Sequence, residues 1–150
     1  MSARARVAFG ALLLSLLLTT ASCGVGQKQS GLPAGTQATI DTVTSDLARG
    51  DYDKIYTDAS EEWRRTARAD ESRDNLERIR QTLGSVLSRA QLSAQERGGD
   101  GGSGDAQRRT LVVSYNTKFE RADAIETFTL VQREGRWLLA RYAVNSNALR

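Results

Sequence analysis

The sequence predicts an α+β domain in which N-terminal helices pack on an antiparallel sheet of three to four strands. Two observations carry this prediction. Apolar residues recur at helical spacing up to Gly84, and after Val86 the hydrophobic period changes to two. No internal repeat is evident in the chain, so we expect these helices and strands to share one core.

The helical half divides into several expected segments. In the first, Ile40, Val43 and Leu47 lie on one face, and Gly50 ends the helix because glycine readily adopts the left-handed conformation. Asp51 is placed to cap a short second segment. The apolar stripe of that segment consists of Tyr52, Ile55, Tyr56 and Ala59.

Ser60, followed by two glutamates, predicts that a helix restarts there and runs through Trp63, because a serine side chain can accept orphan amide protons. A third stretch begins at about Asp70 and closes near Gly84. Its apolar residues are Leu76, Ile79 and Leu83. Helices therefore dominate the chain up to this point.

The second half predicts strands. Residues 86–95 alternate between small or apolar and polar side chains, and residues 111–119 give a strict period of two. Residues 126–133 continue the pattern, Glu134 and Gly135 form a tight turn, and residues 137–144 form the last strand. The glycine-rich run from Gly98 to Asp105 predicts a long hairpin loop. Asp100 and Asp105 are oxygen donors in that run, but their spacing does not match a calcium loop.

The N-terminus carries the pattern of a secretory signal. Arg4 and Arg6 precede an uncharged run from Val7 to Ser22 that contains six leucines. This run of 16 residues is short for a membrane span, which needs about 20. The small residues at positions 20–22 come directly before Cys23, the single cysteine of the chain.

This arrangement resembles a lipobox, in which the cysteine thiol is lipidated and becomes the new N-terminus. A lipobox usually has leucine where this chain has Thr20. We expect residues 1–22 to be a lipoprotein signal peptide and Cys23 to carry palmitate that anchors the exported bacterial protein to a cell-envelope membrane. The alternative is ordinary cleavage after Ser22, which leaves a soluble secreted or periplasmic protein.

Residues 23–36 are rich in Gly, Gln and Ser and contain Pro33, so they predict a flexible tether ahead of a single domain at 37–150. The signal holds two arginines and no acidic residue, so the mature chain has 19 basic and 18 acidic side chains, a net charge of +1. Balanced charge in an exported protein argues against a nucleic-acid partner.

A mixture of arginines and acidic residues fills positions 61–80. Such a mixture is typical of a solvated helical face with pairs such as Asp74 and Arg78 at i,i+4, and anionic lipid headgroups are the alternative partner. The basic residues are Arg64, Arg65, Arg68, Arg73, Arg78 and Arg80, and the acidic ones are Glu61, Glu62, Asp70, Glu71, Asp74 and Glu77.

An ordered series of short motifs resembles a family of exported bacterial proteins called domain of unknown function 4019. The series spans roughly residues 38–145. It consists of Gly50-Asp51-Tyr52, Tyr56, Ser60, Trp63, the pattern R-x-x-L-G-x-x-x-x-R from Arg80 to Arg89, Tyr115-x-Thr117-x-Phe119, Glu126-Thr127-Phe128-Thr129-Leu130, Gly135-Arg136-Trp137 and Tyr142. The resemblance implies a cystatin-like or nuclear-transport-factor-like fold, in which a curved sheet wraps around helices. It implies no biochemical role.

The composition argues against catalysis. The chain has no histidine, which removes the side chain best suited to proton transfer near neutral pH and the usual zinc ligand sets. Asp58 with Tyr52 or Tyr56 would be the remaining acid–base pair. Those tyrosines share a stripe with Ile55 and Ala59, which indicates burial instead. We expect no catalytic residue, cofactor or metal.

The aromatic residues are candidates for a pocket lining or for the core. Glu126 joins them because it shares a strand face with Phe128 and Leu130. If this face is inward, the carboxylate needs a partner, and Arg80 or Arg89 could provide it. The candidate pocket or core residues are Tyr52, Tyr56, Trp63, Tyr115, Phe119, Glu126, Phe128, Trp137 and Tyr142.

Two functions follow from these observations. The leading expectation is a lipid-anchored envelope protein whose domain binds a protein partner or acts as a scaffold, without catalysis. The partner could be another envelope protein or a second copy of this chain. The alternative is a pocket protein that binds, or less readily transforms, a small apolar ligand in the cone between sheet and helices.

Overall fold

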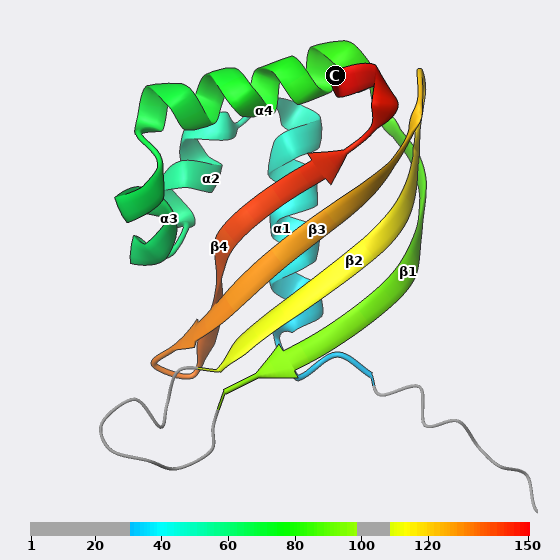
Figure 1. Ribbon diagram of the computed structural model, residues 1–150. Helices are drawn as coiled ribbons and strands as arrows, with labels where there is room; N and C mark the ends of the chain where they lie inside the picture. Colours follow the sequence, from blue (N-terminus) through cyan, green and yellow to red (C-terminus); the bar gives the residue numbers. More distant parts are fainter. Residues whose placement is uncertain (1–30, 99–108) are drawn as a thin grey trace, which may run out of the picture. The chain divides into compact units, whose positions relative to one another are not determined.

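The computed structural model describes residues 31–98 and 109–150 (Figure 1). Helices come first and strands follow, as the change of period predicts. The elements are α1 (Thr36–Arg49), α2 (Tyr52–Asp58), α3 (Glu61–Thr66), α4 (Ala69–Leu83), β1 (Val86–Arg97), β2 (Thr110–Phe119), β3 (Asp123–Arg133), β4 (Arg136–Asn145) and a final 3-10 turn, η1 (Asn147–Leu149). The signal peptide, Cys23 and the aspartates of the glycine-rich loop lie outside the described residues.

The folded unit begins slightly before the expected boundary at residue 37. Thr36 is fully buried, and its hydroxyl donates to the carbonyl of Pro33 at 2.6 Å. Leu32 also packs against the core. The last residues of the expected tether therefore belong to the domain.

The first helix, α1, buries Ile40 and Val43, with Leu47 half-buried on the same side. It ends at Gly50, whose φ of 78° is left-handed, as predicted. The caps of the next two helices differ from the prediction. Asp51 makes no side-chain cap on α2, because its carboxylate binds Arg49 instead, at 2.8 Å.

Ser60 likewise makes no side-chain cap on α3, although the helix begins directly after it. Its amide N–H donates to the carbonyl of Leu139 in β4 at 2.9 Å. This bond to the sheet, and not a serine cap, fixes where α3 starts.

The longest helix, α4, buries Leu76, Ile79 and Leu83 and ends at Gly84, as predicted. Gly84 has a φ of +81°, and a Cβ atom there would lie 2.5 Å from the carboxylate of Glu120. Glycine is therefore required both by the backbone conformation and by the close approach.

The acidic and basic residues of the helices are mostly exposed, but the predicted pair of Asp74 with Arg78 is wrong. Arg78 donates to the amide oxygen of Asn75 at 2.9 Å. Arg73, one turn earlier, reaches Asp53 of α2. Arg78 thus takes a nearer partner on its own helix, while Arg73 joins α4 to α2.

The sheet has the order β1-β2-β3-β4 within the described residues, and every neighbouring pair is antiparallel. Glu134 and Gly135 join β3 to β4, with φ values of 50° and 77°, the conformation that two-residue hairpins favour. Figure 1 shows the helices on one side of the sheet and the strands bending around α1. The predicted α+β class, with helices packed on an antiparallel sheet, is confirmed.

The strand register gathers the predicted inward residues on the helix side of the sheet. Tyr115 pairs with Glu126, and Phe128 pairs with Tyr142. Phe128 is fully buried, and its ring lies 5.8 Å from that of Tyr115 and 5.1 Å from that of Tyr142, measured between centroids. The first contact is edge-to-face and the second is tilted, and aromatic pairs of this kind stabilise a core beyond the area that they bury.

The two edges of the sheet differ. Along β4, helices take up backbone carbonyls that no strand reaches. The hydroxyl of Thr39 donates to Trp137 O at 2.9 Å, next to the bond from Ser60 to Leu139 O. Along β1, the pairing with β2 is interrupted twice, and the extra residues at the interruptions are the exposed Leu87 and Leu92.

Candidate functional site

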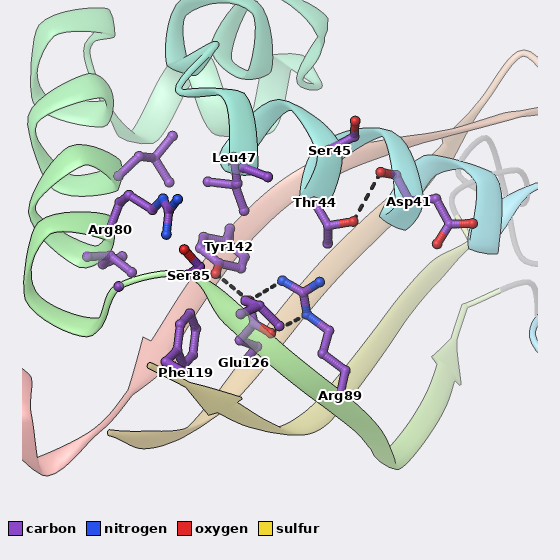
Figure 2. A pocket seen from close by; sticks show the side chains of 15 residues that line it. Asp41, Thr44, Ser45, Leu47, Arg80, Ser85, Arg89, Phe119, Glu126 and Tyr142 are labelled. Atoms are coloured by element: carbon purple, nitrogen blue, oxygen red, sulfur yellow. Dashed lines mark hydrogen bonds and ion pairs between the residues drawn. The ribbon is translucent and has the colours of Figure 1, made fainter. Parts of the chain in front are cut away.

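A cavity of about 320 Å³ lies between α1, α4 and the helix-facing side of the sheet (Figure 2). Its volume is at the lower end of the range for small-molecule sites, which starts at about 300 Å³. The apolar part of the lining consists of Leu47, Ala48, Leu76, Ile79, Gly84, Val86 and Phe119. The polar part consists of Asp41, Thr44, Ser45, Arg80, Ser85, Arg89, Glu126 and Tyr142.

Glu126 is the centre of the polar lining. The carboxylate is fully buried and accepts four hydrogen bonds from three side chains. Arg89 donates from Nε to Oε2 at 2.5 Å and from Nη2 to Oε1 at 3.0 Å. Thr117 donates to Oε2 at 2.5 Å, and the phenol of Tyr142 donates to Oε1 at 2.6 Å.

This arrangement explains how a charge is held inside the domain. A buried carboxylate is costly unless it is paired and its oxygens are satisfied. The two-pronged contact with Arg89 supplies the charge, while Thr117 and Tyr142 fill the remaining acceptor positions. Of the two arginines that the sequence offers as partner for Glu126, Arg89 is therefore the correct one.

The ionisation of the neighbouring groups follows from the same contacts. Burial, the charge of Glu126 and the hydrogen bond to it together raise the pKa of Tyr142 well above 10.0. Burial lowers the pKa of Arg89, but the hydrogen bond and charge of Glu126 outweigh it, so the pKa is raised overall. Arg89 is hence charged, and Tyr142 is a neutral donor, at physiological pH.

Arg80 reaches the cavity from α4 and is only half-buried. Figure 2 shows its guanidinium on the cavity side of the helix. Within the described parts of the chain, Arg80 forms neither an ion pair nor a side-chain hydrogen bond. By contrast, the charge of Arg89 is offset by Glu126. Asp41 contributes a carboxylate from α1, and it is exposed.

A family described as "Protein of unknown function (DUF4019)" matches residues 28–142 of this chain. The chain belongs to this DUF4019 family. The matched range runs from ahead of α1 to Tyr142 in β4, so it includes the whole cavity lining. Among curated proteins, none matches the sequence.

In the DUF4019 domain, the predicted pocket or core residues lie in three different places. Phe119, Glu126 and Tyr142 line the cavity. Tyr52 and Tyr56 lie half-buried on α2, away from it, and Tyr56 donates to Ala67 O at 3.2 Å. The remaining four fill the core, and they are Trp63, Tyr115, Phe128 and Trp137.

Sequence reasoning missed the α1 wall of the cavity. Thr44, Leu47 and Ala48 line it, and they follow each other at helical spacing. The signal was present, because Leu47 belongs to the apolar stripe that starts at Ile40, and Thr44 and Ala48 lie beside that stripe on the helix. A second stripe of mixed polar and small residues on this helix, next to the apolar one, indicates a face that is only partly covered by the rest of the protein.

Neither a metal site nor a membrane-spanning helix is present in the described residues. Residues 31–98 and 109–150 contain no group of three or more His, Cys, Asp or Glu side chains placed to hold a metal ion. No helix in the same residues combines the length and the apolar character that crossing a membrane requires.

Proposed function

We propose that this DUF4019 protein is a non-catalytic binding protein that takes up a small, largely apolar ligand in the cavity between α1, α4 and the sheet. The cavity itself carries the proposal. It combines apolar walls from three elements with a few polar groups held in fixed positions, which is the usual composition of a small-molecule site.

The polar groups favour binding over catalysis. All four hydrogen bonds to Glu126 come from donors on the protein, so the carboxylate has no free position for a proton from a substrate. The raised pKa of Tyr142 keeps its phenol protonated. We therefore assign Glu126, Tyr142 and Thr117 to holding the shape of the site.

The proposal includes the location that the sequence predicts. Cys23 carries the lipid, and the segment after it connects the domain to a membrane of the cell envelope. The support is the signal pattern of residues 1–22 and the small residues before the cysteine.

Binding of a protein partner, the first expectation from the sequence, has less support. In the described residues the exposed large apolar side chains are Leu87, Leu92 and Ile125. Leu87 and Leu92 are single residues at interruptions of an edge strand. Scattered apolar residues of this kind are ordinary on a protein surface.

Fluorescence titration of the full mature protein with N-phenyl-1-naphthylamine, an uncharged apolar probe, tests the proposed function. We expect saturable binding that Ala48→Trp abolishes, since Ala48 lines the cavity and is exposed at its mouth. Ala69→Trp, on an exposed position of α4 outside the cavity, is the matched control and should bind as the wild type does. Absence of saturable binding to the wild type, or equal binding by both variants, would contradict the proposal.

A further inference from the structure

We infer that the ligand is an amphiphilic anion, with one acidic headgroup held by Arg80 and an apolar body that lies against the walls of the cavity. This inference rests on the proposed function and names the class of its ligand. The headgroup is a carboxylate or a phosphate monoester, because the planar guanidinium can donate two parallel hydrogen bonds to the oxygens of either group.

Two arginines face the cavity, and only one of them has a counter-charge bonded to it in the described residues. Arg89 is neutralised by a two-pronged contact with Glu126. Arg80 has no such contact in residues 31–98 or 109–150, so the donors of its guanidinium are free to bind a ligand, while exposed Glu120 offsets its charge only through space.

The acidic groups near Arg80 are already engaged or exposed. Glu120 is exposed and accepts the amide proton of Ser85 at 2.7 Å. Hydrogen bonds to Ser85 are the main cause that lowers the pKa of Glu120, and the charge of Arg80 adds to it, but in the described residues the two side chains form no ion pair. Asp41, on α1, accepts from Gln37 at 2.7 Å and is exposed to solvent. Since solvent screens an exposed carboxylate far more than a ligand placed inside the cavity, Asp41 weakens the preference for an anion but does not reverse it.

Arg80 lies next to the apolar walls of the cavity. Leu76 and Ile79 belong to the same helix and line the cavity beside it. Phe119 and Val86 approach from the sheet, and Leu47 approaches from α1. A ligand that places its acidic group at Arg80 therefore has apolar surface on three sides for the rest of its length, and a purely apolar ligand would leave a half-buried cation without a partner.

Displacement of bound N-phenyl-1-naphthylamine by decanoate and by 1-decanol, two ligands with the same chain, measures the contribution of the headgroup at pH 7.5. For the wild type, we expect decanoate to bind about tenfold more tightly than decanol. In Arg80→Gln, decanoate should weaken by about tenfold while decanol is unchanged. Arg80→Lys should retain most of the preference because it keeps the charge.

Arg78→Gln is the matched control. Arg78 lies on the same helix, is exposed, and among the described residues hydrogen-bonds to Asn75 alone, so both ligands should bind as they do to the wild type. Decyl phosphate, as a third competitor, distinguishes the two headgroups, since the tighter of the two anions identifies the natural one. Either order supports the inference, provided that both anions depend on Arg80.

Two results would overturn the inference and leave the proposed function standing. One is equal affinity for decanoate and decanol in the wild type. The other is an unchanged preference in Arg80→Gln while the variant still binds the probe, which itself shows that the cavity is intact. Failure of the wild type to bind the probe is a different result, because it refutes the proposed function and the inference together.

Discussion

Arg89 of β1 and Glu126 of β3 form a two-pronged ion pair across a strand that lies between them. In the sheet, β1 and β3 do not pair with each other, and β2 separates them. Thr117 of β2, which lies opposite Arg89 in the register, donates to the same carboxylate oxygen that Arg89 Nε reaches. Three adjacent strands are therefore joined by one side-chain cluster on the cavity floor.

Replacement of Glu126 by glutamine should destabilise the domain by about 3 kcal/mol. All the partners of Glu126 are donors, so the amide nitrogen of glutamine finds no acceptor and Arg89 loses its counter-charge. Urea denaturation followed by circular dichroism measures the change. Glu96→Gln, which removes the exposed pair with Arg109, should barely move the midpoint, and a similar loss in both variants would show that burial of the pair is unimportant.

The stability of the domain should fall as the pH rises above about 10. The pKa of Tyr142 is raised well above 10.0 in the folded state, so the unfolded chain loses this proton first and is favoured once the pH exceeds the unfolded value. Below that value the contribution is fully present. Unfolding free energies measured between pH 8 and pH 11 should decline more steeply for the wild type than for Tyr142→Phe.

Tyr142→Phe should also be less stable than the wild type at pH 8, because the carboxylate of Glu126 loses one donor. Tyr115, whose pKa is raised mainly by burial, is present in both proteins, so its titration cancels in the comparison. Equal slopes for the two proteins would mean that Tyr142 ionises as easily when folded as when unfolded.

Gly84→Ala should destabilise the domain by at least about 1 kcal/mol. The left-handed backbone disfavours a side chain, and the new Cβ would press on Glu120, whose carboxylate holds the amide of Ser85. Thermal unfolding provides the measurement. Gly31→Ala is the control, because nothing lies within 4 Å of a Cβ at that position, and it should leave the melting temperature unchanged.

Cys23→Ser should abolish incorporation of a fatty acid into the protein. Since Cys23 is the only cysteine of the chain, no other thiol can replace it. Metabolic labelling with an alkyne-bearing fatty acid, followed by gel fluorescence, measures the incorporation, and Ser30→Ala should label as the wild type does. Labelling that persists in Cys23→Ser would refute the lipid anchor, and an unlabelled wild type would favour the soluble secreted form.

The fold could be predicted because its signals are local. The spacing of Leu76, Ile79 and Leu83 predicts α4, and the strict alternation of residues 111–119 predicts which face of β2 is buried. The sites of chain reversal at Gly50 and Gly84 are also local, since a left-handed residue depends on its own backbone conformation.

The candidate site was predicted only in part because it depends on contacts between distant segments. The sequence indicates that Glu126 needs a cation, but the choice between Arg80 and Arg89 depends on strand register, which places Arg89 opposite Thr117. The predicted pair of Asp74 and Arg78 failed for a different, local reason, because Asn75 on the same helix accepts from Arg78 instead. For Glu126, local spacing defines which arginines are within reach, and tertiary packing selects between them.

Both edges of the sheet are built in a way that hinders the addition of a further strand. An edge strand is a template on which another chain can add a strand, which leads to polymers. On β4, Thr39 and Ser60 already donate to the carbonyls of Trp137 and Leu139, with which an added strand would need to pair. On β1, the extra residues Leu87 and Leu92 break the regular ladder, so an incoming strand can stay in register for only a few residues. Strand addition between copies is thus disfavoured at both edges, and the irregular edge of β1 opposes fibre growth by this route.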